Sequence, residues 1–434
     1  MSFLNKKISE FSLSYLLIFY LISVSVFIIF SNFYLELYLG KFPNYIDENN
    51  EIILKSLPFD FGDLLNNLYY KNEYVQKVVP FEIDFYLARL PFYPIFISLI
   101  AKINLNFYFI FFVKNIFSFS VIFFTSYVFL RDWNKSFFHF ILFLTLYWYN
   151  PYNTHVLLSL DFSDTLISIF FPLIILLINS KNFYLNALFG IFIFCLYLLK
   201  PSIWIFSIIF PILILIFNLI KFKREFLKTD LFAIFCLIIA IFSWGIFGLK
   251  KANYFPIGAS SNSTSTFYLT SLLNSKFHNH YPFLSIDLLL DTEAPKNIKF
   301  LDEKEVYDYY KIKNFKFIKE NYYDYSKGVF KKITFILFGI YEDGKFNNDK
   351  KIRYSNIPNK FIMIVALIYA FSSIINSLYK RKKLSYFDLI FISMFLLYIA
   401  PHIIAWATSK HLVPLFLLSK IYIFIKLFAC SKYQ

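Results

Sequence analysis

Charged residues and cysteine are scarce in this chain of 434 residues. Lysine, arginine, aspartate and glutamate together make up only 16% of the positions, whereas 58% are hydrophobic and 23% are aromatic. Because soluble globular domains carry about 25% charged residues, this composition excludes an ordinary water-soluble globule. The three cysteines, Cys195, Cys236 and Cys430, lie in or beside apolar stretches. They form neither a disulfide framework nor a metal site of four cysteines.

Long apolar runs make up most of the chain. Windows of roughly 20 residues, each long enough to cross a hydrocarbon core of about 30 Å as a helix, recur along the whole chain. Helices satisfy their own backbone groups in lipid, so runs rich in Phe and Ile should be helical here. We predict an all-α polytopic membrane protein, one integral-membrane domain over residues 1–434 with about ten transmembrane helices. The predicted spans are 12–34, 107–130, 136–150, 155–179, 183–199, 202–220, 231–249, 360–379, 385–402 and 409–428.

The basic residues predict the orientation of the chain, because cytoplasmic loops carry an excess of Lys and Arg. On the span count above, the short basic segments fall on one side, which we take as the cytoplasm together with the N-terminus. They include Lys6, Lys7, Lys181, "KFKREFLK" (221–228) and "KRKK" (380–383). The formal net charge of +15 then reflects topology and a lysine-rich outer loop, and not a nucleic-acid footprint. No small-residue cleavage site follows the first span, so we interpret it as a retained anchor.

Two long segments lie outside the membrane on this topology, residues 35–106 and residues 250–359. The first outer loop ends in "ARLPFYPIFISLI" (88–100), which is too short to cross and predicts a helix lying in the interface. The second outer loop begins with a Ser/Thr/Asn-rich patch and contains the short apolar run "ITFILFGI" (333–340), which we expect to be interfacial or re-entrant. No period of 20–50 residues recurs, which argues against a solenoid.

Asp161 and Asp164 lie in the otherwise apolar run "LLSLDFSDTL" (157–166). Positions three apart share one face of a helix, so both carboxylates can point into one cavity. Ionisable groups at such depth are costly and usually mark function. The alternative is a pair of helix-start carboxylates that complement the helix dipole and cap free amides.

In the first outer loop, Asp60 and Asp63 precede apolar residues at 64, 65, 68 and 69, a spacing that predicts an amphipathic helix. A carboxylate at its start can act as a general base towards a sugar or lipid hydroxyl, or hold a divalent cation. The alternative is an ordinary solvated loop acid.

Several cations fall at the predicted outer boundary: Arg89, Lys114, Lys200, Lys251, Lys410 and His411. Such groups from several helices can converge on a phosphate or pyrophosphate at the bilayer surface. The alternative is snorkelling of lysines towards water, without any ligand. The remaining histidines show no metal-ligand spacing.

The order of these motifs resembles the GT-C superfamily of membrane glycosyltransferases. An acidic first loop, "RLPFYP", "LSLDFSDTL", "LLKPSIW", "NYFPIGASSNSTS" and "SKHLVP" follow one another along most of the chain. Within that superfamily, the motifs resemble those of bacterial members such as protein O-mannosyltransferases and the aminoarabinose transferase that modifies lipid A.

The resemblance assigns roles to particular residues. It implies that Asp60 or Asp63 is the catalytic base or metal-linked acid, and that Asp164, with Asp161 as an added or alternative member, is a second acid or binds the acceptor. The donor phosphate would be bound by cations of three motifs. These are Arg89 of "RLPFYP", Lys200 of "LLKPS", and Lys410 and His411 of "SKHLVP". Lysine replaces the more usual arginine in the last motif, which weakens a bidentate phosphate clamp.

The activity implied is inverting transfer of a sugar from a polyprenyl-phosphate donor to a lipid, glycan or protein acceptor, on the outer face of the bacterial cytoplasmic membrane. No cofactor is certain, and a divalent cation stays open. Two other functions remain as alternatives. A transporter or flippase predicts inverted repeats and short outer loops, neither of which is evident. A polysaccharide polymerase or ligase predicts an arginine-rich outer loop, whereas the second outer loop has only Arg353 and many lysines.

Overall fold

The computed structural model describes about half of the chain, and that half is mostly helical. The described residues are 61–78, 83–106, 183–220, 227–257, 298–338, 357–382, 384–404 and 412–428, together with Ser271 and isolated positions between 54 and 175. Apart from the helices, this part of the chain contains a two-stranded antiparallel sheet, β1 (Gln76–Lys77) and β2 (Asp84–Phe85).

Four of the described helices are long and apolar enough to cross a membrane, which indicates a membrane protein. They are α10 (Trp204–Ile220) with the preceding 3-10 turn η3 (Pro201–Ile203), α11 (Leu227–Ala252), α17 (Ile357–Tyr379) and α18 (Tyr386–Ile404). They match the predicted spans 202–220, 231–249, 360–379 and 385–402. The total of ten stays a prediction, because 12–34, 136–150 and most of 107–130 and 155–179 lie outside the described residues.

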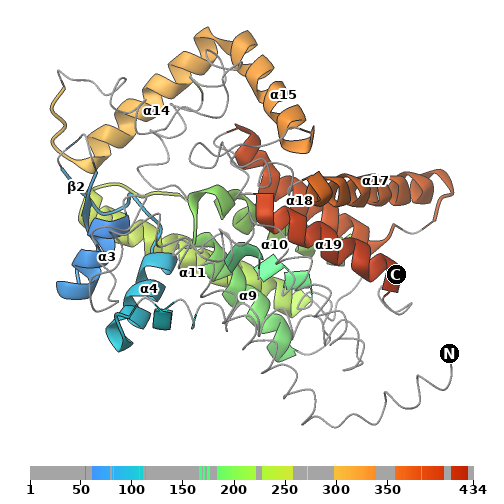
Figure 1. Ribbon diagram of the computed structural model, residues 1–434, viewed down its shortest axis with the longest axis horizontal. Helices are drawn as coiled ribbons and strands as arrows, with labels where there is room; N and C mark the ends of the chain where they lie inside the picture. Colours follow the sequence, from blue (N-terminus) through green and yellow to red (C-terminus); the bar gives the residue numbers. More distant parts are fainter. Residues whose placement is uncertain are drawn as a thin grey trace.

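Shorter apolar helices complete the described bundle: α9 (Phe183–Tyr197) and α19 (Val413–Phe428). α9 packs along α11, α10 contacts both α11 and α18, and α17 lies against α18 and α19 (Figure 1). Gly190 allows the close approach of α9 to α11, because a Cβ atom there would lie only 3.0 Å from Cys236 Sγ. One continuous apolar core joins these helices, with Ile193, Ala240 and Phe391 among its fully buried members.

Polar contacts between α10, α11 and α18 identify one end of this bundle. Asn218, near the end of α10, donates a hydrogen bond of 2.8 Å from Nδ2 to Oδ2 of Asp230, in the first turn of α11. Tyr386, the first residue of α18, lies within electrostatic range of Asp230. We call this side the Asp388 end, after a buried carboxylate described below. The basic segments 221–228 and 380–383 both join helices at this end, whereas α9 ends and α10 begins at the opposite one, the Lys200 end.

The described part of the predicted first outer loop, which we call the first connecting region, lies at the Lys200 end. It contains α3 (Phe61–Tyr70), the β1–β2 hairpin and α4 (Phe92–Ile103). α3 covers the residues at which the sequence predicts an amphipathic helix, and it buries Leu64 and Leu65. α4 begins within the apolar stretch predicted as interfacial (88–100) and continues three residues past its end. One face of α4 packs inward, and the other exposes Ile95, Leu99 and Ile103.

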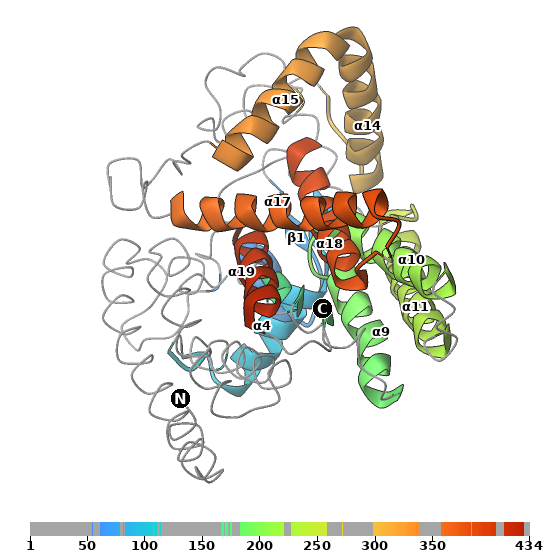
Figure 2. The same cartoon turned by 90° about the vertical axis from the view of Figure 1, so that its right-hand side faces the viewer.

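The described part of the predicted second outer loop, which we call the second connecting region, contains α14 (Glu303–Glu320) and α15 (Tyr322–Phe338). These two helices form an arch over the other helices (Figures 1 and 2). Two side-chain hydrogen bonds start α14: the N-cap residue Asp302 accepts one from the Glu305 amide at 3.0 Å, and the Glu305 carboxylate accepts one from the amide of the preceding Leu301 at 2.8 Å. Val306 and Tyr310 of α14 pack on the β1–β2 hairpin. At the other foot of the arch, α15 contacts α17 and α18.

Candidate functional site

Two of the predicted motifs meet at the Lys200 end. The amide of Phe92, in "RLPFYP", donates a hydrogen bond of 3.0 Å to the main-chain oxygen of Leu198, in "LLKPS". Lys200 itself has extended backbone angles, φ −154° and ψ 137°, at the corner between α9 and η3. The following proline favours this conformation and then opens the next helix at its first position. The segments that carry Arg89 and Lys200 are therefore in direct contact.

Arg89 belongs to a segment that is held on several sides. It is half-buried between the buried residues Ala88 and Leu90, and its Nε atom is closed off from solvent. The hydroxyl of Tyr74 donates a hydrogen bond of 2.8 Å to the main-chain oxygen of Arg89. The Tyr74 ring in turn packs edge-on against Trp244 and Phe247 of α11, with centroids 6.1 and 5.8 Å away. Arg89 is thus anchored to a membrane-spanning helix through Tyr74.

The electrostatics of Tyr74 report on the charges around it. Burial raises the pKa of Tyr74 well above its ordinary value, the positive charge of Arg89 opposes this effect, and the negative charge of Glu303 adds to it. The phenol therefore keeps its proton at neutral pH and acts as a hydrogen-bond donor. Arg89 and Glu303, from two different connecting regions, both lie within electrostatic range of one hydroxyl.

Glu303 joins the second connecting region to this site. Its carboxylate is 2% exposed and accepts hydrogen bonds from the amides of Tyr86, at 2.8 Å, and Leu87, at 3.0 and 3.2 Å. Lys251 Nζ lies 5.6 Å from the centroid of the Tyr86 ring. Lys251 is exposed, whereas the half-buried Arg89 has the partly desolvated setting that suits a group that binds phosphate.

Of the six other predicted site residues, the structure describes only Asp63. Asp63 lies exposed in the first turn of α3, where its charge complements the helix dipole. The others lie outside the described residues: Asp60, Asp161, Asp164, Lys410 and His411. For these five the predicted convergence of acids and cations stays a prediction. No group of three His, Cys, Asp or Glu residues in the described ranges could hold a metal ion.

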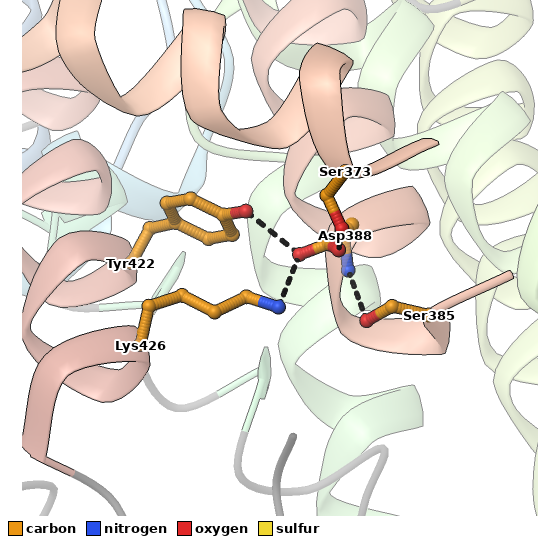
Figure 3. Close-up of polar contacts among 5 residues, drawn as sticks. All are labelled: Ser373, Ser385, Asp388, Tyr422 and Lys426. Carbon is orange, nitrogen blue, oxygen red and sulfur yellow. Dashed lines mark hydrogen bonds and ion pairs between the residues drawn. The ribbon is translucent and has the colours of Figure 1, made fainter. Parts of the chain in front are cut away.

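A second polar cluster, which the sequence analysis missed, surrounds Asp388 in the first turn of α18 (Figure 3). Asp388 is fully buried. Its Oδ1 accepts a hydrogen bond of 2.7 Å from the Tyr422 hydroxyl and forms an ion pair of 2.7 Å with Lys426 Nζ, both from α19. Its Oδ2 accepts a hydrogen bond of 2.6 Å from the Ser373 hydroxyl of α17. The carboxylate thus ties three helices together.

Aromatic rings surround the cation of this cluster. Lys426 Nζ lies 5.8–5.9 Å from the ring centroids of Tyr369, Phe387 and Tyr422. These distances are within the range of cation–π attraction. A buried carboxylate with this many donors is well compensated, so we interpret the cluster as a fastening of α17, α18 and α19.

The signal for Asp388 was present in the sequence. A single acid in the apolar run "YFDLIF" (386–391) is the same kind of feature that singled out Asp161 and Asp164. Glu303 offered a weaker signal, because an acid at the start of a helix is ordinarily explained by the helix dipole alone.

No family model matches the chain, and neither a curated protein nor a solved structure shows a significant match to it. The resemblance to GT-C glycosyltransferases rests on the motifs alone.

Proposed function

We propose that this protein is a membrane glycosyltransferase that moves a sugar from a polyprenyl-phosphate donor to a lipid, glycan or protein acceptor. The observation that carries the proposal is the hydrogen bond between Phe92 N and Leu198 O, at 3.0 Å. It joins the two described motif segments whose cations, Arg89 and Lys200, are expected to bind the donor phosphate. This contact brings together two cation-bearing segments that are more than 100 residues apart in the sequence, as a shared phosphate site requires.

The proposed reaction takes place on the outer face of the bacterial cytoplasmic membrane. Basic segments 221–228 and 380–383 join helices at the Asp388 end, which the positive-inside rule assigns to the cytoplasm. The N-terminus lies on that same side in our proposal. The Lys200 end, with both connecting regions, then faces outwards.

In the chemical step, the acceptor hydroxyl oxygen forms a bond to the anomeric carbon while the bond from that carbon to the phosphate oxygen breaks. The configuration at the anomeric carbon inverts. A carboxylate, Asp60 or Asp63, takes the proton of the hydroxyl. Arg89 and Lys200, with Lys410 and His411, stabilise the charge on the departing polyprenyl phosphate, which is the larger contribution. Asp161 and Asp164 bind the acceptor or orient the first-loop acid.

The lipid part of the donor needs an apolar path beside the phosphate site. α4 follows Arg89 directly and exposes Ile95, Leu99 and Ile103 on one side. This face can contact the polyprenyl chain, because long isoprenoid tails partition with apolar surface.

The proposal is tested by transfer assays in nanodiscs with labelled polyprenyl-phosphate sugars. We expect Arg89→Gln and Lys200→Gln each to lower transfer by about a hundredfold, since each removes a group that stabilises leaving-group charge. Asp60→Asn, Asp63→Asn and Asp164→Asn identify the acid. Lys380→Gln, an exposed lysine at the Asp388 end, is the matched control.

Full transfer by both the Arg89 and Lys200 variants would show that the phosphate site is elsewhere. A parent protein that is inactive with every donor, although it is folded, would overturn the glycosyltransferase proposal itself.

A further inference from the structure

Glu303 contacts the Arg89 segment from the other connecting region. Its two carboxylate oxygens accept from two successive amides, those of Tyr86 and Leu87, which are 217 and 216 residues away in the sequence. Leu87 is fully buried, as are Ala88 and Leu90 beside Arg89. The Leu87 amide is buried, so water does not compete for it, whereas the Tyr86 amide is half-buried; the carboxylate holds this backbone through both.

A carboxylate suits this arrangement because it has two acceptor oxygens. Two adjacent main-chain N–H groups point at one side chain, and a carboxylate offers acceptors to both. A glutamine with its oxygen at the place of Oε2 could accept from both amides, but its NH2 group would then face the Leu87 N–H, and the bond of 3.0 Å to Oε1 would be lost. Glu303 therefore acts on the backbone of residues 86–87 through its charge and its acceptors, and not merely through its volume.

The opposite end of the segment is also fixed. The Arg89 carbonyl accepts from the Tyr74 hydroxyl, and the Phe92 amide donates to Leu198. Residues 86–92 are therefore held at three places by partners from three parts of the chain. Of these three hydrogen-bond contacts, only that of Glu303 comes from the second connecting region. It adds to the apolar cluster in which Val306 and Tyr310 of α14 join Ala88.

We propose that Glu303 is a positioning residue that holds residues 86–89 in the conformation that presents Arg89 to the donor phosphate. This inference rests on the proposed function and extends it: docking of α14 on the first connecting region sets the affinity of the phosphate site. A displacement of α14 by an acceptor or by another molecule would be transmitted to Arg89 through the same two amides.

The test compares Glu303→Gln with Asp308→Asn in nanodiscs. Asp308 is an exposed acid of the same helix, so its substitution is the matched charge-removing control. Hydrogen exchange of peptides covering residues 84–93 reports directly on the two amides. Binding of polyprenyl phosphate, measured by native mass spectrometry, reports on the phosphate site. Thermal unfolding midpoints identify variants that are merely unfolded.

We expect Glu303→Gln to speed exchange of the Tyr86 and Leu87 amides by about tenfold or more, because a charge-assisted bond to each is weakened. Affinity for polyprenyl phosphate should fall by about tenfold, whereas Asp308→Asn changes neither quantity. Glu303→Asp, which retains the charge but is shorter, should recover part of the affinity.

Unchanged exchange at residues 86–87, or unchanged affinity despite faster exchange, overturns the positioning role. If the parent protein binds no polyprenyl phosphate and transfers no sugar, the proposed function fails. The exchange comparison still decides, independently of that failure, whether Glu303 holds the segment.

Discussion

The hydroxyl of Tyr74 reaches the main-chain oxygen of Arg89 across 15 residues of sequence, at a distance of 2.8 Å. This hydrogen bond joins the two ends of the stretch that contains the β1–β2 hairpin. Because the Tyr74 ring packs on α11, the bond also connects the Arg89 backbone to that helix. The position of the Arg89 backbone is consequently set by a tyrosine and not only by its own neighbours.

Tyr74→Phe should weaken the site without removing any charge. The ring can keep its packing on Trp244 and Phe247, but the hydrogen bond to Arg89 is lost, which costs about 1 kcal/mol of stability. We expect a small fall in the thermal midpoint and a rise in the KM for the donor, at nearly constant kcat. Tyr70→Phe, at an exposed tyrosine, is the control. Unchanged donor KM in Tyr74→Phe would show that this bond does not serve the phosphate site.

The Asp388 cluster should be sensitive to loss of either charge. Asp388→Asn or Lys426→Met leaves one buried charge without its counterpart, which costs about 3–5 kcal/mol. The double variant should be less destabilised than the sum of the two, because it leaves neither charge behind. Thermal unfolding in detergent measures the coupling. Strict additivity would contradict a direct ion pair.

A surface ion pair serves as the comparison for that cycle. Lys316 and Glu320 lie 4.0 Å apart on the exposed side of α14. Breaking this pair should hardly change the thermal midpoint, because exposed pairs are screened by solvent.

The stability of the parent protein should depend on pH through Lys332 of α15. Burial lowers the pKa of Lys332 to about 7 from its ordinary value of 10.5. Between these two values the unfolded chain binds more protons than the folded one, so stability rises as pH increases, by at most about 1.4 kcal/mol per pH unit. Below pH 7 both states are protonated, and the folded state bears the full cost of the buried charge.

Lys332→Met should therefore flatten the rise of the thermal midpoint between pH 7 and pH 9. Lys327→Met, at an exposed position of the same helix, should leave that rise as it is in the parent. An identical pH dependence in the parent and in Lys332→Met would exclude Lys332 as its source.

Gly248 should not tolerate a side chain. After α11 ends, Asn253 adopts a positive φ of 59°, and the chain turns back over the helix. A Cβ atom at position 248 would lie 2.5 Å from Pro256 Cδ and 2.8 Å from the main-chain oxygen of Tyr254. Because a backbone atom cannot rotate away, Gly248→Ala should cost about 1–3 kcal/mol.

Limited proteolysis and thermal unfolding measure this effect. Gly248→Ala should expose the chain around Tyr254 to protease at a temperature at which the parent resists. Ser243→Ala, on the exposed side of the same helix, is the control. Equal protease resistance in the two variants would contradict the close packing.

The sequence predicted best what depends on nearby residues. The spans that became α10, α11, α17 and α18 are continuous apolar windows, a local property, and the bend at Lys200 follows from the adjacent Pro201. Partners from distant segments could not be predicted in the same way. Nothing in "RLPFYP" specifies that Phe92 bonds to Leu198, and nothing near Glu303 specifies Tyr86 and Leu87.

The candidate site illustrates the same difference. Arg89 and Lys200 were selected as cations at a boundary, and their segments do meet. Asp63 was selected as an acid near the start of a helix, and the structure places it there but exposed. Asp388 was not predicted, although its local context resembles that of Asp161, because it follows the basic segment 380–383 and so lies at the expected inner boundary.

The outward surface of α17 has a consequence for how the protein must be handled. Few of its side chains are buried, and Phe361, Ile368, Ile375 and Leu378 all point away from the rest of the molecule. These side chains are exposed, and an apolar face of this kind is suited to contact with acyl chains. After solubilisation, detergent contacts these side chains instead, so we expect the choice of detergent to affect how stably α17 packs on α18 and α19.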